Sequence, residues 1–448
     1  WNPAEMIGAS PSPLSRSFYE LLITDVTAMR SRAMLGYRDV SNVPLMVNIA
    51  ERCYINGKIS FTSFIPASLS DELAQKLLNF YLRMLKKYPE RRDKIEFEIC
   101  FTCYEPDLHS RLSVLEHHDF SSQERNIIFD ALLDITRNML ANIDADLHSV
   151  ELLKEKVKQS KFREEKGQNL FESIKDVIEI TKEYGTLPFA NLARYAFVAM
   201  AILNSLVRSK HISDFELEHF MQELCTVSRE LIRDVTFLRN KSITRIDFLK
   251  RYGHLRPGAY NICSKRYDEA FEVYFPDKCE IRDPFEAKSE TRSLFQMEDG
   301  RQRDITDYLG STGLNVTFNE LLVFCKKSLE GRESAKFIFT EILSDILKDL
   351  SDFGASIDIH DHDFSFVDIK KVFQMGNLNQ TEFRHMISTN KINSLHLGSV
   401  KLPDTILSTN DAYFHREVAT RPNFITKKSV IGNVVNEDDL FTANLENK

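Results

Sequence analysis

The sequence predicts a predominantly helical α+β protein, with a small mixed α/β lobe at the N-terminus and a large multi-helix lobe after it. Three observations predict this class. Strand and hairpin signals concentrate in the first 118 residues, apolar residues recur at helical spacing from residue 119 onward, and three capping pairs precede these helical runs: Ser121 with Glu124, Ser213 with Glu216, and Thr317 with Glu320.

Length and composition allow a large buried core. The chain has 448 residues, of which 43% are hydrophobic, and is long enough for two or three lobes. Its 66 acidic and 58 basic residues are spread along the whole chain, so we expect no nucleic-acid partner. Seven scattered cysteines do not form a disulfide framework, which favours a reducing, cytoplasmic location.

The most apolar stretch is predicted to be a buried helix. It runs from Tyr195 to Leu203, is too short for a bilayer, and is flanked by Arg194 and Asn204, so we expect no membrane partner. The chain opens at Trp1 without a charged segment or a cleavage site, so no targeting segment is expected. These first residues are typical of the middle of a longer polypeptide.

Residues 1–118 are predicted to form the mixed lobe. Asn56-Gly57 stands between two extended runs and predicts a hairpin turn. A helix is predicted from Ser70 to Lys87, with acidic residues first and basic residues last. The alternation of polar and apolar residues in Glu96–Phe101 predicts a half-buried strand.

Residues 119–250 are predicted to form a helical lobe. One helix follows Ser121, and another follows Ser213 with an apolar stripe that continues to Val235. The charge-rich stretch 154–166 is predicted to be a solvated helix or connection, the alternative being a binding site.

Residues 251–415 are predicted to contain a turn-rich segment and a further helical block. Prolines and glycines between 251 and 316 are compatible with a mobile loop, and the helical block begins after Thr317. Residues 416–448 are predicted to hold two short strands, 423–426 and 430–435, and then a linker toward a further domain.

The candidate site is the turn Arg251-Tyr252-Gly253-His254-Leu255-Arg256-Pro257-Gly258-Ala259-Tyr260. Backbone amides freed at such a helix end, together with the planar cation of Arg256, would hold an anion, and His254 would accept a proton near neutral pH. The alternative is a helix end capped by glycine, with a structural histidine.

Three other clusters allow a chemical and a structural interpretation. Cys100 and Cys103 have redox or half-zinc spacing, but no second pair follows, so core cysteines are expected. The runs His360-Asp361-His362-Asp363 and Glu116-His117-His118-Asp119 contain metal-ligand residue types, but adjacent loop residues rarely converge on one ion. We therefore expect no metal site, and Asp363 is a candidate helix cap.

Nucleotide-binding signatures are missing from the sequence. It contains no phosphate-binding P-loop, no dinucleotide fingerprint, no nucleophile elbow and no His-Glu-x-x-His helix, and it has only 15 glycines. We therefore expect no cofactor in this segment and no autonomous nucleotide-dependent enzyme.

Several strings, taken in order, resemble the intervening region of phosphoenolpyruvate synthase-like and pyruvate phosphate dikinase-like proteins. They are Trp1-Asn2-Pro3-Ala4-Glu5-Met6-Ile7-Gly8, Pro13-Leu14-Ser15, Leu22-Ile23-Thr24-Asp25, Gly36-Tyr37-Arg38-Asp39, Pro44-Leu45-Met46, Ser60-Phe61, Ser63-Phe64-Ile65-Pro66-Ala67, Asp93-Lys94-Ile95-Glu96-Phe97-Glu98-Ile99, Tyr184-Gly185-Thr186-Leu187-Pro188-Phe189-Ala190, the Tyr252–Gly258 turn, Gly331-Arg332-Glu333, Lys336-Phe337 and Asn423-Phe424-Ile425-Thr426.

The resemblance implies a multidomain parent. In such proteins an ATP-grasp domain binds ATP and Mg²⁺, and a phosphohistidine domain carries the phosphoryl group to an acceptor. In the similarly arranged rifampin phosphotransferases the intervening region binds the acceptor. The implied function is therefore an acceptor-binding central domain of an ATP-dependent phosphotransferase, whose partners are the ATP-grasp and phosphohistidine domains and a small-molecule acceptor.

The resemblance implies a role for two residues only. His254 would accept the acceptor's proton, and Arg256 would stabilise the transferred phosphoryl group. The sequence departs from the family where Asn56-Gly57-Lys58 replaces an Asp-x-Arg-like string and where Leu255 separates His254 from Arg256, so pyruvate is not assigned as the acceptor. Two alternatives remain open: a non-catalytic spacer or dimerisation scaffold of the same enzyme, and a free-standing metal hydrolase using His360 and His362.

Overall fold

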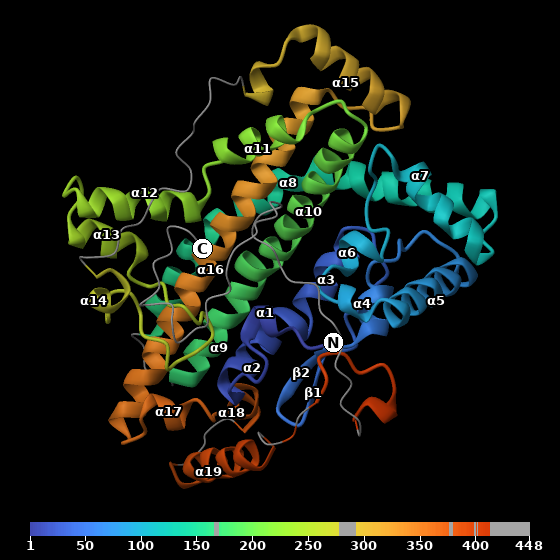
Figure 1. Cartoon of the computed structure of the whole chain (residues 1–448). Helices are drawn as coiled ribbons and strands as arrows, with labels where there is room; N and C mark the ends of the chain where they lie inside the picture. The colour runs from blue at the N-terminus through green and yellow to red at the C-terminus, as the bar shows by residue number, and fades with distance from the viewer. Residues whose placement is uncertain (165–169, 277–292, 376–379, 398–399, 401, 413–448) are drawn as a thin grey trace, which may run out of the picture.

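Three long helices run side by side through the centre of the molecule (Figure 1). The computed structural model describes residues 1–164, 170–276, 293–375, 380–397, 400 and 402–412. The protein is 70% helical and 3% strand, which confirms the predicted class. The central helices are α8 (Ser122–Glu164), α10 (Leu187–Arg208) and α16 (Phe318–Ser356).

The N-terminal region packs against α8 and α10. It contains α1 (Ala4–Ile7), α2 (Pro13–Tyr19), η1 (Glu20–Thr24), α3 (Thr27–Met34), β1 (Met46–Ile49), β2 (Arg52–Ile55), α4 (Gly57–Thr62), α5 (Asp71–Lys87), η2 (Pro89–Arg91), α6 (Ile95–Glu98), α7 (Leu108–Leu112) and η3 (Ser113–His118).

The remaining elements flank the central helices. They are α9 (Leu170–Thr181), η4 (Lys182–Thr186), α11 (Asp214–Glu223), α12 (Val227–Arg239), α13 (Arg245–Tyr252), α14 (Phe271–Tyr274), η5 (Leu294–Gln296), α15 (Asp299–Ser311), α17 (Asp361–Phe364), α18 (Ile369–Met375), α19 (Gln380–Leu397) and η6 (Thr409–Ala412).

Two large apolar clusters form most of the core. The first joins α4, α5 and α7 to α8, α10, α15 and the N-terminal half of α16. The second joins α2 and α9 to the C-terminal half of α16 and to α17, α18 and α19. Both clusters contain residues from all three of the predicted segments 1–118, 119–250 and 251–415, so these segments share their apolar cores. The predicted segment 416–448, with its two strands and its linker, lies outside the described residues.

Glycine allows the central helices to approach closely. A Cβ atom added at Gly331 of α16 would lie 2.6 Å from Leu147 Cδ2 of α8 and 3.3 Å from Leu192 Cδ2 of α10. Larger side chains at this crossing would force the helices apart.

A β-hairpin is present, but the predicted position of its turn is wrong. Strands β1 and β2 pair antiparallel, with Met46 opposite Ile55, and the turn lies at Ala50 and Glu51, both with positive φ. Asn56 instead caps α4, because its side-chain oxygen accepts the backbone N–H groups of Lys58 and Ile59. A local cap therefore prevails over the Asn-Gly turn signal.

The predicted strand at Glu96–Phe101 is also wrong. Ile95–Glu98 form α6, and the backbone from Ile99 to Phe101 is not in a strand. Ile95 and Ile99 are buried four residues apart while Phe97 is 53% exposed, which is a helical burial pattern. Over these six residues, polar and apolar side chains alternate as in a strand only by coincidence.

Most predicted helix starts are confirmed. Ser70 caps α5, and the Ser213–Glu216 and Thr317–Glu320 capping boxes are both formed. The helix predicted after Ser213 is interrupted, however, because α11 ends at Glu223 and Thr226 caps a new helix, α12.

Within the charge-rich stretch, residues 154–160 belong to α8 and most of their side chains are exposed. Part of the predicted mobile loop, 277–292, lies outside the described residues.

The apolar stretch Tyr195–Leu203 is a buried helical segment, as predicted. By length and composition the run Leu170–Arg208 qualifies as one candidate membrane span among the described residues, but 72% of its most apolar window is buried inside the protein. This burial is consistent with the core helix of a soluble protein.

Residues near both ends of the described chain meet at the hairpin. Trp1 and Ile55 exchange backbone hydrogen bonds, and the Asn2 N–H donates to the Asp404 carbonyl over 2.8 Å. The Tyr54 hydroxyl donates to the Pro403 carbonyl, and Arg92 pairs with Asp404 at 2.7 Å. We call this region, made of Trp1, Asn2, β2 and residues 402–404, the hairpin pole.

Candidate functional site

The predicted turn begins where α13 ends. Tyr252 is the last helical residue, and its hydroxyl donates to Asp234 of α12 over 2.9 Å. The backbone N–H groups of Gly253, Leu255 and Gly258 donate to Leu249, Tyr252 and Ser264 respectively. Because the chain itself uses these three amides, they do not form the predicted anion cradle.

His254 is buried beside α16. Only 6% of its surface is exposed, and its ring meets the ring of Phe337 edge to face at a centroid distance of 4.7 Å. Its Nε2 atom is buried and has no hydrogen-bond partner among the described residues. Burial lowers the pKa of His254, so the imidazole is neutral near pH 7.

Arg256 is half-buried and, like His254, contacts α16. Its Nε and a terminal nitrogen donate to Ser344 Oγ and the Ser344 carbonyl over 3.2 and 3.3 Å, and the other terminal nitrogen donates to the Asn261 carbonyl over 3.4 Å. These partners are all neutral, and within the described part of the chain the guanidinium forms no ion pair with a carboxylate. Burial lowers the pKa of Arg256.

Ser344 of α16 connects the two predicted site residues. Its hydroxyl donates to the His254 carbonyl over 2.6 Å and accepts from Arg256 Nε. The structure therefore brings His254 and Arg256 together around one serine. The signal for this serine in the sequence was weak, because α16 is 39 residues long and nothing marks Ser344 as the contact point.

Two other strings that carry the family resemblance contact this turn. Phe337, from Lys336-Phe337, packs against both Tyr252 and His254. Ser15, from Pro13-Leu14-Ser15, donates to the Tyr260 carbonyl over 2.9 Å, and the Tyr19 and Tyr260 rings meet edge to face. Segments far apart in the sequence thus hold the turn against α2 and α16.

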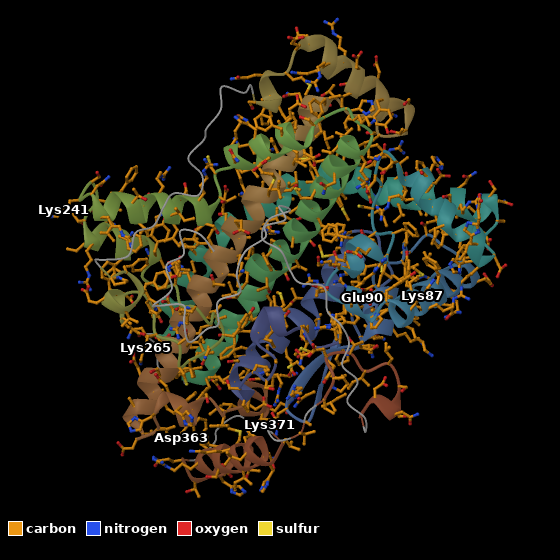
Figure 2. The ribbon with its side chains drawn as sticks, in the orientation of Figure 1. Lys87, Glu90, Lys241, Lys265, Asp363 and Lys371 are labelled. Atoms are coloured by element: carbon orange, nitrogen blue, oxygen red, sulfur yellow. The ribbon has the colours of Figure 1, made fainter. Side chains whose placement is uncertain are left out.

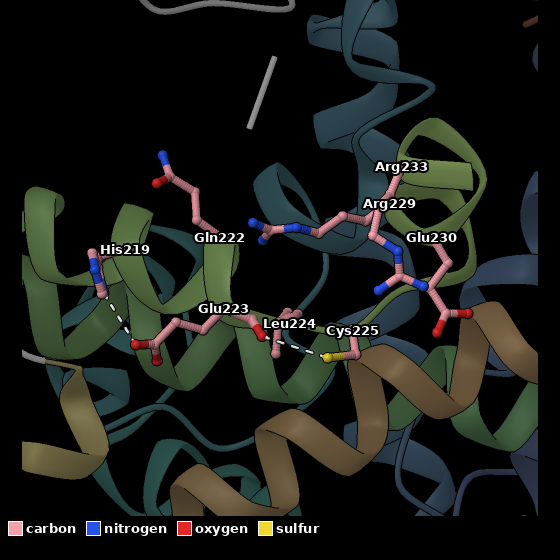
Figure 3. A pocket seen from close by; sticks show the side chains of 8 residues that line it. All are labelled: His219, Gln222, Glu223, Leu224, Cys225, Arg229, Glu230 and Arg233. Carbon is pink, nitrogen blue, oxygen red and sulfur yellow. Dashed lines mark hydrogen bonds and ion pairs between the residues drawn. The ribbon is translucent and has the colours of Figure 1, made fainter. Parts of the chain in front are cut away.

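Among the described residues, surface cavities lie away from this turn, and neither His254 nor Arg256 lines the three considered below. One, of about 500 Å³, lies between α11 and α12. Figure 3 shows its two walls, formed by His219, Gln222 and Glu223 on one side and Arg229, Glu230 and Arg233 on the other, with Cys225 between them. Another, of about 410 Å³, lies between α8 and α9.

The sequence interpretation missed the third cavity, which we call the α6–α10 cavity. It measures about 510 Å³ and is lined by residues of α6, α7, α10 and α11 and of the 99–107 connection: Glu96, Phe97, Glu105, Asp107, Arg111, Phe197, Ala201, Asn204, Val207, Arg208 and Asp214. Beside it, Arg194 is 5% exposed and donates to Glu96 over 2.5 Å and to Thr102 over 2.9 Å. The sequence feature that could have indicated this cavity is Arg194, a charged residue within an otherwise apolar helix.

Acidic residues of both clusters considered for metal binding are engaged in other contacts, and Glu116 pairs with Arg125. Asp361 accepts from Ser351 and pairs with Lys265, while Asp363 pairs with Lys391 at 2.6 Å instead of capping a helix. Figure 2 shows Asp363 at the outside of the molecule near α17. Among the described residues no group of three or more His, Cys, Asp or Glu side chains is placed to hold a metal ion.

Cys100 and Cys103 are core residues, as predicted. Both are buried and free, and burial raises the pKa of each thiol. A thiol held protonated in this way is a poor nucleophile and a poor metal ligand.

No protein-family model matches the chain, and a search of curated proteins finds no significant match.

Proposed function

We propose that this chain is the acceptor-binding central domain of an ATP-dependent phosphoenolpyruvate synthase-like phosphotransferase. In this proposal ATP and Mg²⁺ bind to an ATP-grasp domain of the parent, and a phosphohistidine domain delivers the phosphoryl group. Arg256 stabilises that group as it moves, and His254 accepts the acceptor's proton. The N–P bond of phosphohistidine breaks as the O–P bond to the acceptor forms.

The observation that supports this proposal most strongly is that the half-buried guanidinium of Arg256 has no carboxylate partner among the described residues. A half-buried guanidinium usually lies against a carboxylate, because an uncompensated charge is costly to remove from water. Arg256 donates to three neutral acceptors, and Glu269, Asp361 and Asp268 act on its charge only from a distance, with no ion pair to it among the described residues, so the guanidinium can still bind an anion directly. A planar guanidinium is also well matched to the oxygens of a phosphoryl group.

The state of His254 supports the role of proton acceptor. Its lowered pKa keeps the imidazole neutral, and the buried Nε2 has no hydrogen-bond partner among the described residues. A general base needs this unprotonated state. Because the side chain is buried, the acceptor would reach Nε2 only after a local rearrangement of the turn.

A second function, the non-catalytic spacer, is favoured by one specific observation. His254 is packed edge to face on Phe337, and Arg256 is tied to Ser344, as in ordinary structural packing. In a spacer these contacts would only join the turn to α16.

The test uses the longer polypeptide that this proposal requires, with the two half-reactions measured separately. Arg256→Ala should lower phosphoryl transfer to the acceptor on the order of 100-fold while leaving histidine phosphorylation by ATP unchanged. Arg245→Ala is the matched control, because Arg245 is half-exposed and pairs with Glu272 on the surface. The acceptor itself is found by screening hydroxylated and carboxylated small molecules for added phosphate by mass spectrometry.

The two candidate functions give different results. For a spacer, Arg256→Ala would leave both half-reactions at the level of the Arg245→Ala control. An equal loss of both half-reactions would contradict the acceptor-side role, since Arg256 would then act before the phosphoryl group reaches this domain.

A further inference from the structure

The α6–α10 cavity has an apolar wall. Phe97 of α6 is 53% exposed, and its ring lies 4.2 Å from the ring of Phe197 of α10, centroid to centroid. Ala201 and Val207 of α10 extend the same wall. A largely exposed aromatic ring inside a cavity of about 510 Å³ would gain free energy if an apolar ligand covered it.

The cations of this cavity are already neutralised. Arg208 donates to Glu105 over 2.5 Å and to Asp107 over 2.7 Å, and Arg111 also pairs with Glu105. Glu105 is itself buried, so this ion-pair cluster is a fixed part of the cavity. Because both guanidinium groups have carboxylate partners, the cavity offers no free cation to an anionic ligand.

One carboxylate and one amide remain available. Asp214 begins α11 and is exposed, and within the described residues its carboxylate forms no hydrogen bond or ion pair. The Asn204 side chain of α10 also has no hydrogen-bond partner among the described residues. Glu96, the fourth carboxylate of the cavity, is already paired with Arg194. The free polar capacity of the cavity therefore favours a ligand that donates hydrogen bonds and carries a positive charge.

We infer that the α6–α10 cavity is a binding site for a small amphipathic amine, a molecule with a planar apolar body and a cationic amino group. The apolar body covers the Phe97 and Phe197 rings, and the ammonium group pairs with Asp214 and donates to the Asn204 carbonyl. This inference does not rest on the proposed phosphotransferase function, because the cavity includes neither His254 nor Arg256.

The test compares three probes of similar shape and different charge on the 448-residue chain: phenethylamine, 2-phenylethanol and phenylacetate. Binding is measured by ligand-observed NMR with titration. For fragments of this size we expect an affinity on the order of 1 mM for the amine. The alcohol should bind several-fold more weakly, and phenylacetate should bind most weakly.

Two variants separate the apolar and the charged contributions. Asp214→Asn should reduce the affinity for phenethylamine to that for 2-phenylethanol, and Phe97→Ala should weaken all three probes. Asp299→Asn is the control for Asp214, because Asp299 is also the exposed first residue of a helix, α15. Phe237→Ala is the control for Phe97, because Phe237 is a partly exposed ring of α12 outside the cavity. Both controls should bind the amine as the unmodified chain does.

Three results would overturn the inference: no binding of the amine up to about 10 mM, equal binding of all three probes, or an amine preference that survives Asp214→Asn. Circular dichroism and thermal unfolding of each variant establish that a lost signal reflects the cavity and not the loss of the fold.

Discussion

At the scale of single residues, His254 shows how burial alters a titratable group. The ring is removed from water and packs against Phe337, and this burial lowers the pKa of the imidazole. In the unfolded chain the same imidazole titrates near its ordinary pKa of about 6.5. The folded protein therefore binds fewer protons at His254 than the unfolded chain does once the pH falls below that value.

We predict that His254 makes folding stability fall as the medium becomes acidic. The loss begins as pH decreases through the unfolded pKa and ends below the folded pKa, because stability rises with pH wherever the unfolded state binds more protons. Urea unfolding at about pH 7.5 and about pH 5 should show a smaller pH-dependent loss in His254→Gln than in the unmodified protein. His148→Gln is the control, because His148 is exposed on α8. An identical pH dependence in His254→Gln and the unmodified protein would show that the burial of His254 has no such effect.

The sequence indicates the turn that holds His254 and Arg256 but does not indicate which residues pack around it. Helix-end residues and a Gly-Pro turn are visible locally, so the end of α13 was predictable. The contact with Ser344 joins residues 88 positions apart, and no local pattern encodes it. The same holds for the α6–α10 cavity, whose walls come from four helices.

At the scale of elements, the side-chain caps were the most reliable signals. Ser121, Ser213 and Thr317 each accept a backbone N–H at the helix start that their spacing predicted. The wrong predictions, the strand at Glu96–Phe101 and the turn at Asn56-Gly57, rested on very short patterns. Over six residues or fewer, helical and extended patterns overlap, and neighbouring elements decide between them.

We predict that Gly331 is needed for the packing of α16 against α8 and α10. Gly331→Val should destabilise the protein by roughly 1–3 kcal/mol, because the added methyl groups meet Leu147 and Leu192. Gly300→Val is the matched control: Gly300 lies in α15 with no neighbouring atom within 4 Å of an added Cβ, and the change should stay within about 0.5 kcal/mol. Denaturant unfolding measures both. Equal stability of the two variants would mean that the helix crossing relaxes freely.

At the scale of the whole molecule, the predicted class was recoverable from composition and periodicity, since long apolar repeats at helical spacing fill most of the chain. Which helices of the predicted segments pack against each other could not be predicted from the sequence. The first core cluster joins residues from Leu35 to Ala335, so helices of different predicted segments complete each other's apolar faces. Periodicity indicates that a face is buried but does not indicate its partner.

We predict that the purified 448-residue chain does not turn over ATP. The sequence lacks the phosphate-binding loops that such turnover requires, and in the proposed function the nucleotide binds to another domain. Release of inorganic phosphate from Mg-ATP should equal the buffer blank, with a known ATPase as the positive control. Turnover that co-purifies with the chain through successive chromatographic steps would contradict both this prediction and the proposed division of labour.

The hairpin pole has a mechanical consequence. Because the Asn2 N–H donates to the Asp404 carbonyl and Arg92 pairs with Asp404, a pulling force applied between residues 2 and 404 acts first on these few bonds. The helices α8, α10 and α16 lie outside that short load path. Pulling on these two residues should therefore break the contacts of the hairpin pole first and leave the packing of the three central helices intact.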